Sequence, residues 1–296
     1  GVTGVQTCAL PISAPTDAAS MVREITDLRI LSKTEQWPES YPEEDINKTE
    51  EEKLHGGALL INELIKTDLS DKNVLFYGCG EGHAGYVMHQ LFNTRKVICY
   101  DLSDNNWNHF DKCNGLVYTT DLNYVKSQEN FDIIVLNDVI DHMSDIEKTL
   151  KEIAQLKNKK TKIFVRCHPY TSRDGCHLSS QINKAYLHLV FDHDELFKLG
   201  YKPYNTNKYI NPLKTYRKLF EDAGLKIESE KVKKANVELF FTLNPAILRR
   251  IKENFKESDN QSYSDGKSFP RDILEIQSVD LDRKSTRLNS SHANIS

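Results

Sequence analysis

The sequence has 296 residues and a formal net charge of −4, and no run approaches the ~20 apolar residues that a membrane-spanning helix needs. This length suits one α/β domain with a sizeable core, or such a domain with a cap. The acidic balance makes nucleic acid an unlikely partner, because proteins that bind it usually carry a basic face. The cysteines are scattered and suggest a reducing, cytoplasmic setting rather than a disulfide framework.

Both ends of the chain resemble translated sequencing-adapter sequence. GVTGVQTCALPIS at 1–13 and RKSTRLNSSHANIS at 283–296 show no apolar period. A signal peptide is the alternative for 1–13, but the segment has no basic start and only a short apolar patch. Setting both segments aside changes the net charge to −7, because the tail holds three basic residues and no acid.

The segment before the first expected strand has two parts. Residues 14–45 are polar and interrupted by prolines, which predicts a loose lead-in with one short helix near 21–31. From residue 46 to residue 65, apolar side chains recur at helical spacing. This second part is therefore predicted to be an amphipathic helix.

Five short apolar runs predict buried parallel strands. They lie at 74–77, 96–100, 116–119, 131–136 and 162–167. Segments of helical period lie between the first two runs and again at 145–156. Strands that alternate with helices predict βαβ units and a doubly wound α/β fold.

The last third of the chain has a different pattern. Residues 168–211 hold no clean strand and are expected to form a helical cap insertion, with one or two lid helices at 183–197. Pro212 begins a predicted helix that ends at Gly224. Two strands, 225–230 and 237–242, follow without room for a helix and are predicted to pair as an antiparallel hairpin. The main domain is thus expected at 46–256, followed by a linker or frayed end at 257–282.

Glycines follow the first predicted strand, in Gly78-Cys79-Gly80-Glu81-Gly82. Glycine permits a tight turn and a close approach of backbone to ligand, at the positive end of the next helix. Residues 80–85 also match G-x-G-x-x-G, with Asp101 placed 21 residues beyond Gly80. That spacing keeps a nicotinamide or flavin enzyme open, as it does a tight turn without a ligand.

Three motifs occur in order and carry a family resemblance. They are Val74-Leu75-Phe76-Tyr77-Gly78-Cys79-Gly80-Glu81-Gly82-His83, Tyr100-Asp101-Leu102-Ser103 and Phe131-Asp132-Ile133-Ile134-Val135-Leu136-Asn137-Asp138-Val139-Ile140-Asp141-His142. Over residues 53–242 the chain resembles the class I S-adenosylmethionine-dependent methyltransferases. The resemblance implies a mostly parallel seven-stranded sheet of order 3-2-1-4-5-7-6 and S-adenosylmethionine as cofactor.

The resemblance also implies roles for individual residues. Gly78, Gly80 and Gly82, with Cys79 between them, would hold the methionine end of the cofactor. Asp101 would accept hydrogen bonds from the ribose hydroxyls beside Leu102, and Asp121 would contact the adenine amino group. Asn137 and Asp138 would face the methionine moiety and the substrate. Helix capping is the structural alternative for Asp121, and capping of the turn is the alternative for Asp138.

One position departs from the family pattern. The family commonly has an acid two residues before the first glycine, where this chain has Phe76. Another group must then supply the polar contact, or the affinity for the cofactor is reduced. His142 usually orders the start of a helix in the family and is interpreted as structural.

Candidate catalytic groups follow the fifth predicted strand, whose carboxyl end is where ligands of such sheets bind. His168 is the candidate general base, with Asp138 beside the substrate, and Arg166 or Arg173 is the candidate for binding an anionic or carbonyl group. The pairs Cys167-His168 and Cys176-His177 lack the usual spacing of a zinc knuckle, so no metal is expected.

The sequence therefore predicts a methyltransferase that acts on an O, N or C nucleophile of a small or medium-sized metabolite. Two other classes stay open. One is a nucleotide-dependent oxidoreductase, which the predicted hairpin and the fourth-strand motif disfavour. The other is a non-catalytic binding protein on the same fold, which Phe76 keeps possible.

Overall fold

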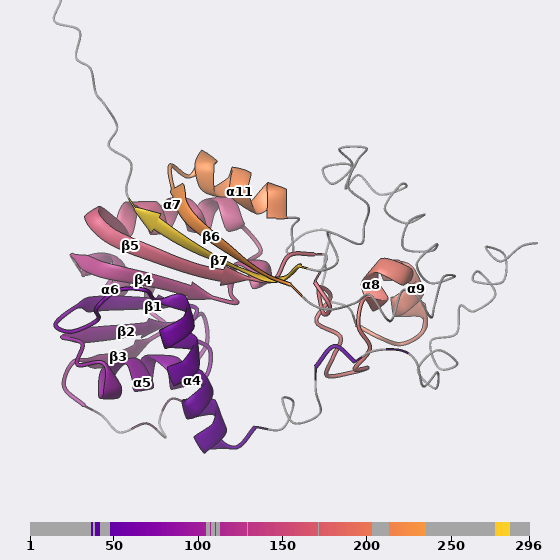
Figure 1. Ribbon diagram of the computed structural model, residues 1–296, viewed down its shortest axis with the longest axis horizontal. Helices are drawn as coiled ribbons and strands as arrows, with labels where there is room; N and C mark the ends of the chain where they lie inside the picture. The colour runs from indigo at the N-terminus through magenta and orange to yellow at the C-terminus, as the bar shows by residue number, and fades with distance from the viewer. Residues whose placement is uncertain are drawn as a thin grey trace, which may run out of the picture.

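The computed structural model describes residues 37, 39–41, 48–104, 107, 110, 113–128, 130–170, 172–202, 213–234 and 276–284. Five parallel strands run side by side in the order β3-β2-β1-β4-β5 (Figure 1). Their bounds are β1 Asn73–Tyr77, β2 Lys96–Tyr100, β3 Leu116–Thr119, β4 Phe131–Asn137 and β5 Lys157–Cys167. This arrangement confirms the predicted α/β fold with a parallel sheet.

Strand β5 begins earlier than the apolar pattern predicts. Its first residue is Lys157 rather than Lys162, and the register with β4 shifts between Phe131 and Ile133. The added residues 157–160 are polar and half-buried or exposed, so they carry no signature of a buried strand. Thr161, which follows them, is buried and donates its hydroxyl to the carbonyl of Phe131 at 2.6 Å.

Two further strands continue the sheet beyond β5, in the order β5-β7-β6. Strand β6 spans Lys226–Lys234, and β7, Ile276–Lys284, pairs antiparallel with both of its neighbours. The predicted strand at 237–242 lies outside the described residues, as does the predicted helix near 21–31. The hairpin expected from 225–230 and 237–242 therefore stays a prediction.

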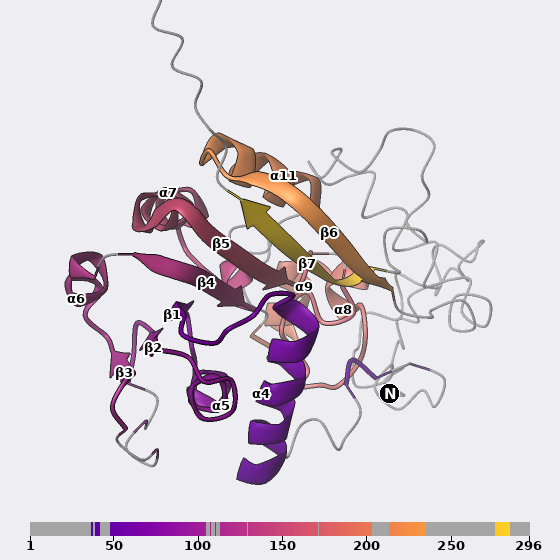
Figure 2. The same ribbon diagram turned by 60° about the vertical axis from the view of Figure 1, so that its left-hand side comes forward.

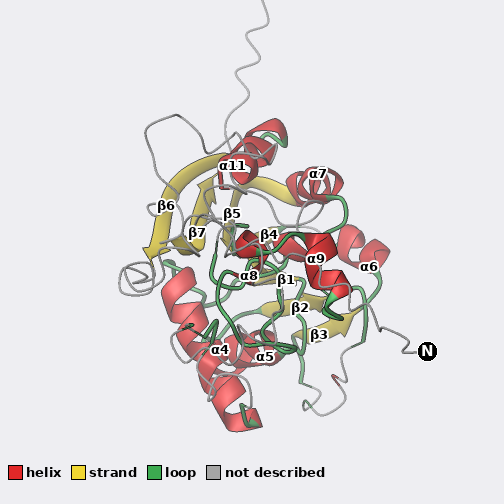
Figure 3. Ribbon diagram, turned by 90° about the vertical axis from the view of Figure 1, so that its right-hand side faces the viewer, coloured by secondary structure: helices red, strands yellow, loops and turns green. Residues whose placement is uncertain are grey.

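Helices cover both faces of the sheet (Figures 2 and 3). On one face, α4 (Glu50–Leu64) and α5 (His83–Leu91) bury an apolar cluster with Val74, Phe76 and Val97. On the other, α6 (Leu122–Ser127), α7 (Ile146–Leu156) and α11 (Leu213–Asp222) pack over Leu75 and Ile134. Adjacent strand residues thus serve opposite cores, because side chains alternate along a strand.

The insertion after β5 lies beyond the carboxyl ends of the parallel strands (Figure 1). It contains α8 (Leu187–Val190) and α9 (His193–Lys198), so helices form where one or two were predicted, and their role as a lid stays a prediction. Its apolar cluster includes Trp37, whose indole N–H donates to the carbonyl of Ala185 at 2.9 Å. Residues near the start of the described chain therefore help to hold the insertion. Of the described helices, none has the length and apolar character needed to cross a membrane.

Candidate active site

The chain turns sharply at the end of β1, in residues 78–82, which we name the glycine loop. Gly78 and Gly80 have positive φ of 75° and 54°, a region that residues with a Cβ rarely adopt. A Cβ on Gly78 would lie 2.1 Å from Cγ2 of Val139, whereas a Cβ on Gly80 would meet no atom within 4 Å. Packing therefore requires glycine at position 78, and Gly80 presents bare backbone to open space. Gly82 ends the loop as the N-cap of α5.

The competing dinucleotide-type pattern ends at Gly85, inside α5. A Cβ there would lie 2.1 Å from Sγ of Cys99 on β2. This glycine lets the helix approach the strand closely, a packing requirement that holds with or without a nucleotide. Gly85 is therefore explained without a nicotinamide or flavin ligand.

Asp101 follows β2 and is joined to the glycine loop by hydrogen bonds. Its Oδ2 accepts the N–H of Gly80 at 2.8 Å. The carbonyl of Tyr100 accepts the N–H groups of Gly78 at 2.8 Å and Cys79 at 3.0 Å. The loop and the carboxylate therefore form one unit at the ends of two neighbouring strands, and Cys79 contributes through its backbone.

A cavity of about 910 Å³ opens beside this unit. Five of the predicted site residues line it: Gly78, Gly80, Asp101, Leu102 and Asp138. The remaining wall includes residues 142–145, which precede α7, and the first turns of that helix. The cavity falls in the range of roughly 300–1,000 Å³ that is typical of small-molecule and cofactor sites.

The other predicted residues lie outside the lining of this cavity. Asp121 is the N-cap of α6 and accepts the N–H of Asn123 at 2.8 Å, which is the capping role named as its alternative. Asn137 ends β4, and its buried Oδ1 has no hydrogen-bond partner among the described residues. Gly82, Cys79, Arg166 and His168 support or flank the site without lining the cavity.

The three predicted catalytic residues lie at the adjacent ends of β4 and β5. Nε2 of His168 is 3.2 Å from Oδ1 of Asp138. Burial alone would raise the pKa of Asp138, but the contact with His168 and the charges of His168 and Arg166 hold this pKa below its usual value. Asp138 is therefore a carboxylate at neutral pH. The guanidinium of Arg166 is largely buried and lies 3.2 Å from Oε2 of Glu63 on α4, so its principal partner is within the protein.

Two tyrosines of the cavity wall were not among the predicted site residues. Tyr77 and Tyr100 end β1 and β2, and their ring centroids are 4.8 Å apart. Burial raises the pKa of both phenols, and each is raised further by nearby acids. Both hydroxyls therefore stay protonated at neutral pH and can donate hydrogen bonds. Their position directly before Gly78 and Asp101 is the signal that could have identified them.

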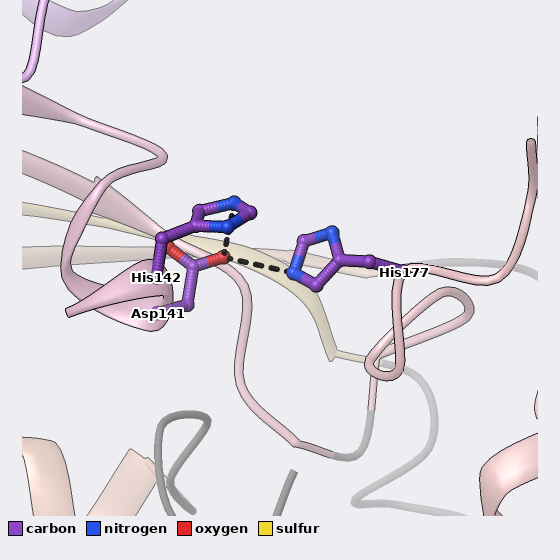
Figure 4. Close-up of side chains that lie close together, drawn as sticks. All are labelled: Asp141, His142 and His177. Atoms are coloured by element: carbon purple, nitrogen blue, oxygen red, sulfur yellow. Dashed lines mark ion pairs between the residues drawn. The ribbon is translucent and has the colours of Figure 1, made fainter. Parts of the chain in front are cut away.

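A second polar cluster adjoins the cavity and was also not predicted (Figure 4). Nε2 of His177, in the insertion, lies 3.5 Å from Oδ2 of Asp141, and Nε2 of His142 lies 4.0 Å from the same oxygen. His142 lines the cavity, although its sequence position suggested a structural role. The acid–His pair 141–142 is visible in the sequence, but its third member is 35 residues away and only folding brings it near.

Phe76, the departure from the family pattern, points away from the cavity. It is 3% exposed and belongs to the core under α4 and α5. The next residue, Tyr77, lines the cavity instead.

Three comparisons relate the chain to known proteins. A family model described as a methyltransferase domain matches residues 52–230. Among solved structures, coclaurine N-methyltransferase bound to N-methylheliamine and SAH matches with 16% identity, 90% of this chain, 85% of that chain and a TM-score of 0.46. A SAM-dependent methyltransferase from Archaeoglobus fulgidus matches with 15% identity over 82% of this chain and 97% of that chain, with a TM-score of 0.46. A chain of the Haloferax volcanii Trm112 methyltransferase activator complex matches with 12% identity, 92% and 99% coverage and a TM-score of 0.46. Curated proteins gave no match.

Proposed function

Because this chain belongs to the methyltransferase domain family, we propose that it transfers a methyl group from S-adenosylmethionine to an O, N or C nucleophile of a small or medium-sized metabolite. The observation that carries the proposal is the joining of Gly80 and Asp101 at the wall of one cavity. A carboxylate that can accept hydrogen bonds, that of Asp101, therefore lies beside the backbone of Gly80 at this wall. A cavity of about 910 Å³ is large enough for a nucleoside and part of an acceptor.

The described residues fit the cofactor in three places. Asp101 would accept hydrogen bonds from the ribose hydroxyls, Gly80 would admit the methionine end without a side chain in the way, and Leu102 would cover the adenine. The side chain of Leu102 is 87% exposed while lining the cavity, which is unfavourable until an apolar surface covers it. Asp121, which caps α6, would in addition contact the adenine amino group. Asn137, with its buried and unpartnered Oδ1, accepts a hydrogen bond from the methionine moiety.

The bound cofactor supplies an electrophilic methyl group on a sulfonium. His168 prepares the acceptor by removing its proton. The carboxylate of Asp138, 3.2 Å from Nε2 of His168, stabilises the imidazolium that forms when His168 takes up the acceptor's proton. Arg166 keeps Asp138 ionised and is positioned by Glu63. Methyl transfer to a nucleophile prepared in this way depends mainly on positioning and on exclusion of water.

Titration calorimetry on the full, untagged chain tests the cofactor. We expect S-adenosylmethionine and S-adenosylhomocysteine to bind with micromolar affinity, and NADH not to bind. Asp101→Ala is expected to weaken both by about 100-fold, because two charge-assisted hydrogen bonds are lost. Asp68→Ala, at an exposed aspartate before β1 and outside the cavity lining, is the matched control. Binding of NADH alone would favour the oxidoreductase, and binding of none by a folded sample would favour the non-catalytic protein.

The proposal of a small acceptor rests on the acidic balance of the chain and the size of the cavity. A reducing, cytoplasmic setting is proposed with it, because Cys99, Cys167 and Cys176 are buried thiols. Methylation assays with nucleic acid and with pooled small metabolites separate the two acceptor classes.

The seventh strand is part of the same proposal. Beside β5, a strand is covered on both faces, and such strands are predominantly apolar. Val237–Thr242 reads VELFFT, whereas Ile276–Lys284 includes two aspartates, an arginine and a terminal lysine. We therefore propose that 237–242 occupies the place beside β5 in the native sheet. Ending the chain after residue 275 should then leave folding and cofactor binding intact, and unfolding of the shortened chain would contradict the proposal.

A further inference from the structure

Asp141, His142 and His177 gather around one point at the junction of the sheet and the insertion (Figure 4). Asp141 and His142 come from the short helix Ile140–His142 after β4, and His177 comes from the insertion. One ligand atom of each residue lies within 4.8 Å of the others. The two histidine rings, with centroids 4.4 Å apart, meet over the same carboxylate.

The carboxylate of Asp141 is the second observation. The residue is 0% exposed, and neither of its oxygens has a hydrogen-bond partner among the described residues. A buried carboxylate without such partners is unfavourable unless a cation compensates its charge. The two imidazoles lie 3.5 Å and 4.0 Å from Oδ2, distances that are long for hydrogen bonds.

The distances of 3.5 Å and 4.0 Å between the histidine Nε2 atoms and Oδ2 of Asp141 are closer to those between ligand atoms that bind one metal ion. With metal–ligand bonds of about 2.0–2.2 Å and a tetrahedral arrangement, neighbouring ligand atoms lie about 3.3 Å apart. Small side-chain rotations would bring the two Nε2 atoms and Oδ2 to that spacing. Imidazole and carboxylate together are also a common donor set for zinc and related divalent ions.

We propose that Asp141, His142 and His177 bind one divalent transition-metal ion of the zinc class. Three protein ligands leave a coordination position open, as in catalytic rather than structural zinc sites. His142 lines the same cavity as Asp101 and Asp138, and we place the open position on this side of the ion, where the methyl acceptor is proposed to bind. The ion neutralises Asp141 and ties the insertion to the end of β4.

The surrounding charges are compatible with a cation. His177 lies near Asp174. Burial and the charges of Asp174, Asp138 and Asp141 raise the pKa of the nearby Tyr41 phenol, and the charge of Arg173 opposes them. His168 is paired with Asp138 and stays outside the ligand set.

The site implies a substrate class, and this step rests on the proposed methyltransferase function. An ion at the acceptor side of the cavity binds an oxygen donor, such as a hydroxyl or carboxylate of the acceptor, at its open position. Coordination lowers the pKa of a hydroxyl and fixes its orientation. The acceptor is therefore expected to present an oxygen function close to, or at, the atom that is methylated.

Metal binding is tested directly on the full, untagged chain after chelation and desalting. Zn²⁺ titration should give one ion per chain, and Co²⁺ should produce the visible d–d absorption of a low-coordinate site. His177→Asn should weaken Zn²⁺ by more than about 100-fold, since loss of a direct ligand exceeds the effect of losing a supporting group. His193→Asn, a histidine of the same insertion with an exposed ring, should leave Zn²⁺ binding unchanged.

Several outcomes would overturn the site. They are the absence of stoichiometric Zn²⁺, binding of Mg²⁺ as tight as that of Zn²⁺, or unchanged binding by a folded His177→Asn variant. A thiolate-to-cobalt charge-transfer band would also overturn it, because it would assign the ion to cysteines such as Cys176. Asp141→Asn is a less suitable first variant, since its buried position makes misfolding a competing explanation.

Calorimetry with S-adenosylhomocysteine on the same samples separates this inference from the proposed function. If His177→Asn binds the cofactor product normally and loses Zn²⁺, both proposals stand. Cofactor binding without any Zn²⁺ binding contradicts the metal site alone. Stoichiometric Zn²⁺ binding without cofactor binding contradicts the proposed methyltransferase function and leaves the metal site standing.

Discussion

The glycine loop and the insertion after β5 both bring polar groups to the carboxyl edge of the sheet, but different forces hold them. In the glycine loop, backbone N–H groups meet the carbonyl of Tyr100 and the carboxylate of Asp101 over a few residues of two adjacent strands. In the insertion, the polar groups depend on an apolar cluster assembled from distant segments, including Trp37. Backbone geometry therefore fixes the first region, and side-chain packing fixes the second.

The largest effect that this comparison predicts is a loss of stability when the glycine loop is substituted. Gly78→Ala places a Cβ 2.1 Å from Val139 at a φ of 75°, and we expect a loss of about 3 kcal/mol of unfolding free energy from overpacking and backbone strain. Urea unfolding measures the loss. Gly56→Ala in α4 is the matched control, because its Cβ meets no atom within 4 Å. It should stabilise the chain by up to about 1 kcal/mol, and equal effects of the two variants would contradict the packing difference.

The next effect belongs to the insertion and depends on pH. Burial lowers the pKa of His188 to about 4, although its hydrogen bond to the carbonyl of Tyr170 opposes the shift. The unfolded chain takes up this proton near pH 6.5, and the folded chain only near pH 4. Unfolding free energy should therefore fall by about 3 kcal/mol as the pH drops from 6.5 to 4.

Urea unfolding across that pH range checks the His188 prediction. His188→Gln should lower stability at pH 7 but flatten the pH dependence between 6.5 and 4. His193→Gln, at an exposed position of the same insertion, should keep the slope of the unsubstituted chain. A His188→Gln profile parallel to the unsubstituted one would assign the pH dependence to other groups.

The two tryptophans of the chain report the two regions separately. Trp107 donates its indole N–H to the carbonyl of Gly80 at 2.8 Å, just as Trp37 donates to Ala185. Each Trp→Phe substitution removes one such bond and should cost about 1–3 kcal/mol of local stability. Trp107→Phe should weaken cofactor binding, and Trp37→Phe should increase proteolysis of the insertion.

The tryptophan fluorescence of the same variants tests whether each ligand affects only one of the two regions. In Trp37→Phe the remaining indole lies against the glycine loop, so S-adenosylhomocysteine should change its emission. In Trp107→Phe the remaining indole lies in the insertion, so Zn²⁺ should change its emission more than the cofactor product does. A response to both ligands in both variants would mean that the two regions move together.

The smallest effect distinguishes two roles of Asp121. Asp121→Ser keeps a side-chain oxygen for the N-cap of α6, and stability should change by less than about 0.5 kcal/mol. The shorter side chain cannot also reach adenine, so affinity for S-adenosylhomocysteine should fall about tenfold. Asp121→Ala should lose about 1 kcal/mol of stability as well. Unchanged affinity in both variants would leave Asp121 with the capping role alone.

The sequence predicted those parts of the molecule that depend on local patterns. The parallel strands were recognisable by their short apolar runs, which are largely buried in β1, β2, β4 and the later part of β5 and half-buried in the edge strand β3. The strand bounds agree closely except at β5, whose first residues are polar. Gly78, Gly80, Asp101, Leu102 and Asp138 were placed by motif, and the structure brings all five to one cavity.

The parts that were not predicted depend on contacts between distant residues. Trp37 and Tyr41 fall in a segment expected to be a loose lead-in, yet Asn183 exchanges hydrogen bonds with the backbone of Tyr41 at 3.0 Å and 2.6 Å. The Cys-His pair containing His177 suggested only a poor zinc knuckle, since its partners Asp141 and His142 have no sequence signal that joins them to it. Periodicity and motif spacing carry no information on such encounters.

The contact between Trp37 and the insertion has a practical consequence for how the protein is shortened. The family match begins at residue 52, so a chain trimmed to that match would lack Trp37 and Tyr41. The surface that Trp37 covers, formed by Ala185 and its apolar neighbours, would then face water and favour self-association. Poor solubility of such a short form would then result from this uncovered surface and not from a defect in the parallel sheet.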